Sequence, residues 1–166
     1  MIVGNGDIAS VLPDRDDLLF FASGVSNSKE DREEEYKREY NLLMDQNRER
    51  HIVYFSSLSV FYSDTPYARF KKEQEKIIKS LWEHWTIIRL GNITWGDNPN
   101  TLINFLRKKI KDDESFSIEP VSRYVVDKEE FLHWIELIPQ WNAEMNIPGK
   151  RMLVAEIVSA IMRQEL

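Results

Sequence analysis

The chain has 166 residues, of which 42% are hydrophobic and 11% aromatic, the composition of a folded protein rather than a disordered one. It has no cysteine, which excludes disulfides and thiolate metal sites and favours a reducing, cytoplasmic compartment. The net charge of −6 at pH 7 argues against nucleic acid as a partner, and no apolar run approaches the ~18 residues that a membrane-spanning helix needs.

Apolar runs alternate with longer, charged, amphipathic segments along the chain. Ser28 is suited to cap a helix whose first turn carries Glu30 and Asp31, and Pro66 is suited to the first turn of another. In chain order, the pattern predicts a strand over 1–3, a short helix over 7–12, a strand over 17–23, a helix over about 29–46, a strand over 51–57, a helix over 66–82, a strand over 86–92, a helix over 100–112, a strand over 115–120, a helix over 127–138 and a last helix from Leu153 onward.

This alternation of strands and helices predicts the α/β class. Strands that are apolar throughout are typical of a parallel sheet with helices on both faces, because neither face of such a sheet meets water. The sequence shows no repeat, no low-complexity linker and no domain boundary. We therefore expect a single domain, residues 1–166, built on a doubly wound parallel sheet.

Small residues surround the first predicted turn from strand to helix. Gly4, Gly6 and Ala9 stand in the stretch VGNGDIA. Glycines at such a turn let a pyrophosphate approach the backbone, and a small third residue lets the helix pack closely on the strand. Glycine-rich turns are common in α/β proteins, so this motif alone makes a dinucleotide only one candidate ligand.

The stretch VYFSSLSVFYSDTPYARFKKEQE joins a strand end, Ser56 and Ser57, to a tyrosine and a lysine one helical turn apart, Tyr67 and Lys71. Free tyrosine has a pKa of about 10 and is a poor base at neutral pH, but a neighbouring ammonium lowers that pKa. A serine hydroxyl can hold the oxygen of a substrate while the tyrosine takes or gives its proton. The alternative is a packing tyrosine, a lysine in solvent and serines that only cap the strand.

The other polar clusters have plainer explanations. His51, His84 and His133 lie on different predicted elements without the spacing of metal ligands, so no metal site is expected. The basic cluster at 107–111 is followed at once by acidic residues at 112–114, which is typical of a solvated helix end.

The order of these motifs resembles that of the extended short-chain dehydrogenase/reductase family, the NAD(P)-dependent nucleotide-sugar epimerases and dehydratases. GNGDIA resembles the cofactor turn of that family, and DLLFFASG resembles its strand ending in small residues beside the cofactor, with Ala22 among them. VYFSSLSVF places Ser57 at the position of the catalytic Ser or Thr, and YARFKKEQE resembles the Tyr-x-x-x-Lys helix. IIRLGNITWG and SRYVVDKEEF resemble two later segments, through Asn92 and Arg123. The resemblance runs from the glycine turn over nearly the whole chain.

By this resemblance the protein is an NAD(P)-dependent oxidoreductase, epimerase or dehydratase. Tyr67 would be the acid/base, Lys71 would lower its pKa and hold the nicotinamide ribose, and Ser57 would orient the substrate. The resemblance further implies that NAD or NADP contacts Gly4, Gly6, Ala9, Ala22 and Lys71. It also implies that a nucleotide-linked sugar contacts Ser57, Asn92 and Arg123.

One departure from the family is large. Two strand–helix units, which in the family supply the residue that reads the adenosine ribose, are absent between the glycine turn and 17–23. Strands of the complete fold run in the order 3-2-1-4-5-6, so residues 1–3 are expected at the outer edge of a sheet ordered 1-4-5-6. An open edge favours a homo-oligomer or a protein partner, and a helix carrying Tyr36 and Tyr40 offers a second surface for either. The departure leaves open another hypothesis, a catalytically inactive Rossmann-like module with a structural or interaction role.

Overall fold

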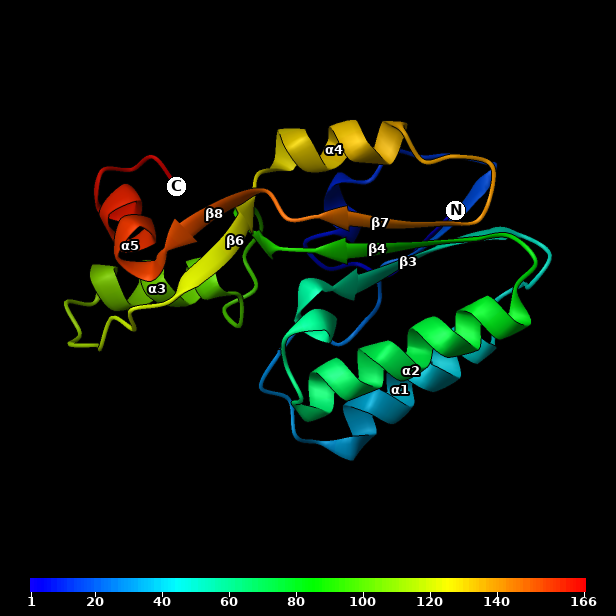
Figure 1. Cartoon of the computed structure of the whole chain (residues 1–166), viewed down its shortest axis with the longest axis horizontal. Helices are drawn as coiled ribbons and strands as arrows, with labels where there is room; N and C mark the ends of the chain where they lie inside the picture. Colours follow the sequence, from blue (N-terminus) through cyan, green and yellow to red (C-terminus); the bar gives the residue numbers. More distant parts are fainter.

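Five parallel strands form the main sheet of the structure, a computed structural model that describes all 166 residues (Figure 1). Their order is β1-β2-β3-β4-β7. The strands are β1 (Ile2–Val3), β2 (Leu18–Phe21), β3 (His51–Ser57), β4 (Trp85–Leu90) and β7 (Ala143–Ile147). The three central strands consist mainly of buried residues, as a sheet covered on both faces requires.

Two long helices, α1 (Glu33–Met44) and α2 (Pro66–Leu81), lie side by side on one face of the sheet (Figure 1). Proline occupies the first turn of α2, and the hydroxyl of Thr65 caps this helix by accepting a hydrogen bond from its third residue at 3.2 Å. Leu43 of α1 and Ile78 of α2 are fully buried in the cluster that joins these helices to the sheet.

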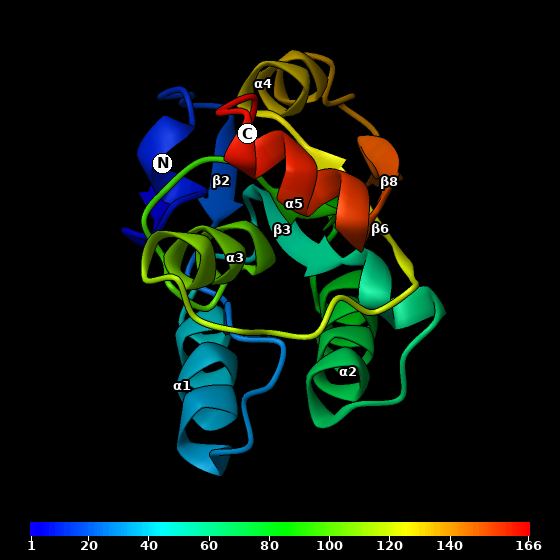
Figure 2. The same cartoon turned by 90° about the vertical axis from the view of Figure 1, so that its left-hand side faces the viewer.

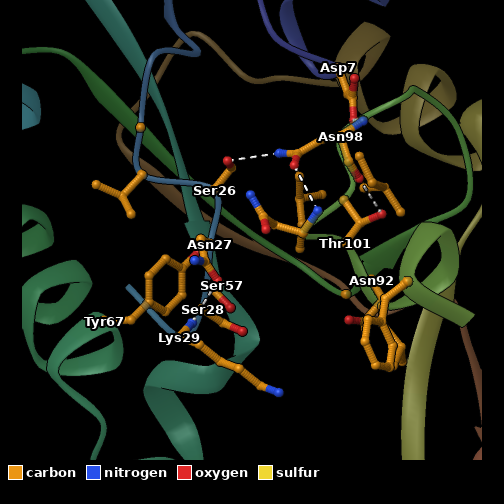
Figure 3. Close-up of a pocket in the computed structure, with 18 of the residues that line it drawn as sticks. Asp7, Ser26, Asn27, Ser28, Lys29, Ser57, Tyr67, Asn92, Asn98 and Thr101 are labelled. Carbon is orange, nitrogen blue, oxygen red and sulfur yellow. Dashed lines mark hydrogen bonds between the residues drawn. The ribbon is translucent and has the colours of Figure 1, made fainter. Parts of the chain in front are cut away.

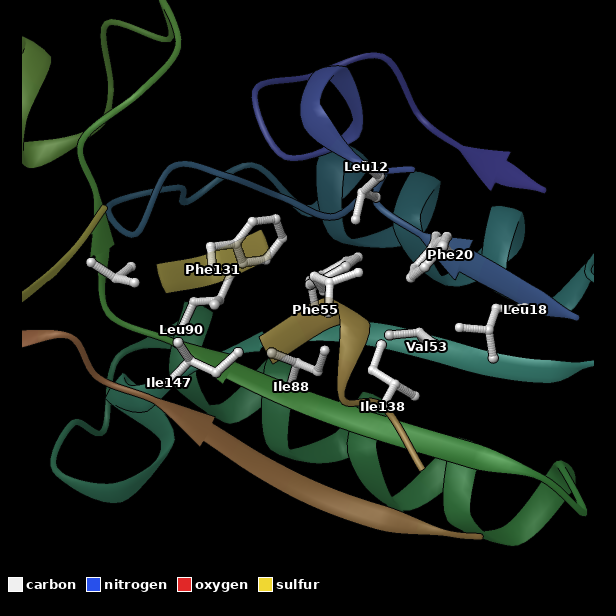
Figure 4. Close-up of a cluster of buried hydrophobic side chains, with 12 residues drawn as sticks. Leu12, Leu18, Phe20, Val53, Phe55, Ile88, Leu90, Phe131, Ile138 and Ile147 are labelled. Atoms are coloured by element: carbon white, nitrogen blue, oxygen red, sulfur yellow. The ribbon is translucent and has the colours of Figure 1, made fainter. Parts of the chain in front are cut away.

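The opposite face is covered by α4 (Lys128–Glu136) and by the single 3₁₀ turn η1 (Ala9–Val11). Phe131 of α4 packs on Phe55 of β3, with ring centroids 5.9 Å apart, at the centre of the cluster in Figure 4. Helices on both faces make the sheet doubly wound, which confirms the predicted fold class.

A second, smaller sheet lies beyond the carboxyl ends of the main strands, and we call it and its helices the small lobe (Figures 1 and 2). It contains β5 (Asn92–Ile93), β6 (Ser122–Val126) and β8 (Lys150–Leu153), with β8 antiparallel to β6. Two helices, α3 (Leu102–Lys111) and α5 (Val154–Met162), pack with this sheet around a buried cluster of their own.

The outer strands of the main sheet are β1 on one side and β7 on the other. β1 pairs only with β2, which confirms that residues 1–3 form an edge and that no strand of this chain lies beyond them. The predicted order is thus right for the first four strands, and β7 extends it.

Several predicted elements are wrong. Residues 115–120 are not a strand; the strand of that region is β6, which finds partners in β5 and β8. The predicted strand 86–92 divides at Gly91, because β4 ends in the main sheet and β5 begins in the small one. A side chain at Gly91 would lie 2.5 Å from the carbonyl oxygen of Pro148, so the chain can pass between the two sheets only as glycine.

Two predicted helices are shorter in the structure. The helix expected over 7–12 is only the turn η1. The helix expected from residue 29 begins at Glu33, because Ser28 and Lys29 lie in a separate turn closed by a hydrogen bond from the Glu30 N–H to the Asn27 carbonyl oxygen. The carboxylate of Glu30 then accepts hydrogen bonds from the backbone of Asp31 and from Arg32, just before the helix. None of the helices has both the length and the apolar character that a membrane crossing requires.

Candidate functional site

A cavity of about 1080 Å³ lies where the carboxyl ends of the main strands face the small lobe. In open α/β sheets this is the edge where ligands bind. Seven of the nine residues singled out from the sequence line it: Gly6, Ala22, Ser57, Tyr67, Lys71, Asn92 and Arg123. The other two, Gly4 and Ala9, do not line it.

The glycine turn forms one wall of the cavity. Gly4 has φ +127°, and a side chain there would lie 2.4 Å from the carbonyl oxygen of Ala22, so this glycine allows β1 to lie close to the end of β2. Gly6 has nothing within 4 Å of the position of a Cβ atom, which leaves open space for a ligand. Ala9 is buried in η1. Because η1 is one 3₁₀ turn, the chain has no long helix whose N-terminus could face a pyrophosphate here.

Asp7 ties the glycine turn to the small lobe. Its carboxylate accepts hydrogen bonds from the backbone N–H groups of Asp97 and Asn98, both at 3.1 Å, and its carbonyl oxygen accepts one from the Trp95 indole at 3.0 Å. Asn98 in turn donates to the Ser26 hydroxyl at 2.8 Å, as Figure 3 shows. The loop after β2 and the loop before α3 are therefore joined across the cavity.

Ser57 and Tyr67 are brought together as the sequence predicts. Ser57 ends β3, where its hydroxyl accepts from the backbone of Ser59 and begins the short turn η2 (Leu58–Phe61). Tyr67 lies in the first turn of α2, is buried, and faces Ser57 (Figure 3). Burial raises the pKa of Tyr67 above its usual value; Lys71 and a hydrogen bond with Ser57 oppose that rise, while Glu39 adds to it. The net effect is a raised pKa, because burial outweighs the lowering by Lys71 that the sequence resemblance implied.

Lys71 borders the cavity, but its ammonium is held by a residue that the sequence analysis missed. Glu39 of α1 accepts from the Lys71 Nζ at 2.9 and 3.1 Å through its two oxygens, and the Tyr54 hydroxyl accepts from the same nitrogen at 3.1 Å. All three side chains are fully buried. The sequence contains a signal for this: Glu39 stands four residues before Leu43, on the inward stripe of a helix where an unpaired charge is costly.

Ser56, unlike the neighbouring Ser57, belongs to a buried network of hydrogen bonds. Its hydroxyl donates to Glu75 of α2 at 2.6 Å, and Glu75 also binds Arg89 of β4 through two hydrogen bonds of 2.9 and 2.6 Å. This buried group joins α2 to two strands of the sheet. It is a structural network beside the cavity.

The small lobe supplies the far wall. Asn92 of β5 donates to the carbonyl oxygen of Tyr124 at 2.9 Å, which fixes its amide beside β6. Arg123 lies 3.5 Å from Glu119, and its side chain is about two-fifths exposed (38%) at the cavity. Lys29 reaches the cavity from the loop after β2, with its nitrogen 6.0 Å from the ring centroid of Phe105 in α3. The cavity thus combines basic groups with a partly apolar wall.

No protein-family model matches the chain, and no curated protein sequence does either. Solved structures do match its fold. The Bordetella bronchiseptica enzyme WbmG, in complex with NAD and UDP, matches with a TM-score of 0.65 and 13% identity over 89% of this chain and 56% of its own. The Thermus thermophilus UDP-glucose 4-epimerase, in complex with NAD, matches with a TM-score of 0.65 and 15% identity, over 89% and 61%. The dTDP-4-dehydrorhamnose reductase of Bacillus anthracis, in complex with NADP, matches with a TM-score of 0.67 and 15% identity, over 90% and 62%.

These comparisons confirm the predicted resemblance at the level of the fold. The fold is the Rossmann-like α/β fold of nicotinamide-dependent enzymes such as these epimerases and reductases. The chain spans about three fifths of the length of each of the three. The TM-scores of 0.65 to 0.67 establish a shared fold. At identities of 13–15%, function has to be argued from the site.

Proposed function

We propose that this chain binds NAD or NADP in the cavity and is an oxidoreductase-, epimerase- or dehydratase-like protein that acts on a nucleotide-linked sugar. The strongest support is that the residues selected from the sequence come together in the structure. Residues chosen from separate stretches of sequence, between Gly6 and Arg123, line one cavity at the edge of the sheet where such ligands bind. Ser57 and Tyr67 face each other there, with open space beside Gly6.

The nicotinamide half of the dinucleotide fits this site better than the adenosine half. Ala22, Ser57 and Tyr67 lie over the central strands, and a bound nicotinamide would supply or accept a hydride there. Ser57 would hold the reacting oxygen, and Tyr67, protonated at neutral pH because its pKa is raised, would donate a proton to it. Beyond β1 no strand exists to carry an adenosine-reading residue, so that half would lie over the open edge.

The basic groups suit a ligand with phosphates. Lys29, Arg38 and Arg123 line the cavity from three different elements, and each offers charged donors to a phosphate oxygen. Among the matching structures, WbmG was solved with UDP. We propose that a nucleotide sugar enters from this side, with Asn92 and Arg123 of the small lobe as its contacts.

One observation favours a second candidate function, a catalytically inactive module with a structural or protein-interaction role. The lysine of the Tyr-x-x-x-Lys pair is engaged by Glu39 and Tyr54, so it has no donor free for a ribose. A module of this kind would keep the cavity and lose turnover.

A turnover assay separates the two candidates. The protein is mixed with NAD, NADP, NADH or NADPH and a panel of nucleotide sugars and keto-sugars, against a blank without protein. The nicotinamide absorbance is followed and the sugars are analysed for conversion, because an epimerase or dehydratase returns the hydride and leaves the cofactor unchanged. A change in the cofactor that depends on the sugar, or conversion of the sugar itself, supports the enzyme. Binding of either ligand without turnover supports the inactive module, and binding of neither contradicts the proposed ligands.

A further inference from the structure

The Lys71 ammonium uses all its hydrogen bonds inside the protein. It donates to Glu39 Oε1 at 2.9 Å, to Glu39 Oε2 at 3.1 Å and to the Tyr54 hydroxyl at 3.1 Å. An ammonium has three N–H donors, and here three acceptors lie around it. Its side chain is 2% exposed and that of Glu39 is 0% exposed. A ligand in the cavity therefore finds the lysine already occupied.

Glu39 is itself held in place from two other directions. Its Oε2 accepts from the backbone N–H of Val25 at 2.6 Å, and its Oε1 accepts from the Tyr54 hydroxyl at 2.5 Å. Val25 belongs to the loop that follows β2 and lines the cavity. The carboxylate thus joins α1, β3 and a wall of the cavity. Its position is held by Val25 and Tyr54 as well as by Lys71.

Gly24 shows how closely the pair is fitted to that wall. A Cβ atom at Gly24 would lie 2.6 Å from Lys71 Nζ and 3.3 Å from each oxygen of Glu39. The ion pair therefore lies directly against the loop that carries Gly24, in the wall of the cavity.

The charges of both Lys71 and Glu39 act on Tyr67. Lys71 Nζ lies 5.7 Å from its ring centroid and Glu39 acts on it from α1. The other titratable groups that face it are Tyr54 of β3, Tyr36 of α1 and Tyr62 after η2, and Ser57 contributes a hydroxyl. Because the two charges of the pair oppose each other, Glu39 offsets part of the effect by which Lys71 favours the phenolate.

We propose that Glu39 is the positioning residue that governs this site: it holds Lys71 in a buried ion pair and so withholds the lysine from Tyr67 and from any ligand in the cavity. The inference rests on the proposed function for its meaning, since it states what the lysine of the Ser-Tyr-Lys set does in a site proposed to bind a nicotinamide dinucleotide. Its test needs no ligand, so its failure and the failure of the proposed function are distinguishable.

The test is a direct titration of Tyr67. Tyrosines are labelled with ¹³C at Cζ, the Tyr67 signal is assigned by its loss in Tyr67→Phe, and its pKa is measured by NMR in four proteins. These are the wild type, Glu39→Gln, the double variant Glu39→Gln/Lys71→Met and the conservative Glu39→Asp. The glutamine keeps the shape of Glu39 and an oxygen that can accept from Val25, and the double variant removes both charges of the pair.

The proposal predicts that the pKa of Tyr67 falls by about one unit or more in Glu39→Gln, because an uncompensated cation within about 6 Å favours the phenolate. In the double variant it returns close to the wild-type value, and Glu39→Asp, which keeps the charge, also stays close to it. An unchanged pKa in Glu39→Gln overturns the proposal. A double variant that titrates as low as Glu39→Gln also overturns it, because Glu39 would then act without Lys71.

A measurement on the wild type keeps the proposal testable if Glu39→Gln does not fold. An ammonium locked among three acceptors exchanges its protons slowly, so the Lys71 side chain should give a protected ¹⁵N–H signal at neutral pH, absent from the double variant. Rapid exchange of that ammonium with solvent overturns the proposal.

Discussion

Gly24 leaves no room for a side chain beside the buried ion pair. In Gly24→Ala the new methyl group would meet Lys71 Nζ at 2.6 Å, so the pair or the loop must move. We expect the free energy of unfolding to fall by about 1–3 kcal/mol, the usual cost of forcing an extra carbon into a packed site. Urea unfolding followed by circular dichroism measures this loss.

Gly6→Ala is the matched control, because nothing lies within 4 Å of a Cβ atom at that position. Its free energy of unfolding should stay within about 0.5 kcal/mol of the wild type. Equal losses for the two variants would contradict the close fit of Gly24 against Lys71.

Tyr67→Phe removes one hydroxyl from a buried ring. Packing should survive, and cofactor affinity should change little. Any turnover found with the wild type should fall by about 10²–10⁴-fold, the contribution of a well-placed general acid or base. Steady-state rates at saturating substrate test this. A variant as fast as the wild type would show that Tyr67 is not the general acid or base.

A site residue can be predicted from the sequence when its partners lie close to it along the chain. Ser57 and Tyr67 could be found because a strand end and a helix start, joined by a short connection, have to meet at the sheet edge. Glu39 could not be found in this way, since its partner Lys71 is 32 residues away and only the packing of α1 on α2 brings them together. The structure buries Glu39 together with Leu43 on the inward side of α1.

Among the elements, β7 depends on charged contacts for its place at the edge of the sheet. Its Glu144 accepts from Lys79 of α2 and, at 2.5 Å, from Arg89 of β4. The hydrogen bond from Lys79, together with that from Arg89, holds the pKa of Glu144 below its usual 4.5, while partial burial opposes the shift. A carboxylate with a lowered pKa stabilises the fold above pH 4.5 and loses that contribution as the pH falls through its folded value.

Glu144→Gln should therefore be less stable than the wild type at neutral pH, and the difference should shrink as the pH falls below 4.5. Urea midpoints measured over this range give the comparison. Glu136→Gln, which changes an exposed carboxylate of α4, serves as the control. A difference that does not change with pH would contradict the linkage of Glu144 to its two cations.

The elements that the sequence predicts well are those with continuous apolar runs. β2, β3 and β4 have this pattern because both their faces are covered, and α2 has a clear cap and a proline. β7 (AEMNI) and β8 (KRML) were not predictable in the same way, since both are partly exposed and polar residues interrupt their apolar pattern. Their strand character comes from their neighbours, β4 and β6.

For the whole molecule, the absent strand–helix units leave β1 as an open edge. The carbonyl oxygens of Met1 and Val3 accept from β2, so the peptide N–H of Ile2 between them faces outward. Tyr36, on the other predicted surface, is engaged: its hydroxyl donates to Glu30 and its ring packs 4.8 Å from that of Phe70. The edge is therefore the better candidate for association with a second copy or a partner.

We predict that the protein self-associates at tens of micromolar and that Ile2→Pro, which removes the outward N–H, weakens this association. Tyr40→Lys, on the exposed side of α1, should leave it unchanged. Sedimentation velocity over a concentration series measures both. A monomer at every concentration would contradict the prediction, and sensitivity to Tyr40→Lys alone would move the interface to α1.

The proposed function depends on the binding of a nicotinamide dinucleotide in the cavity between the main sheet and the small lobe. Isothermal titration calorimetry of the protein with NAD and with NADP tests it most directly, with Gly6→Leu as a folded variant whose side chain fills the open space at the glycine turn. We predict a micromolar dissociation constant for one of the two cofactors in the wild type and no binding in Gly6→Leu. Absence of heat with both cofactors at millimolar concentration, or equal binding in Gly6→Leu, would contradict it.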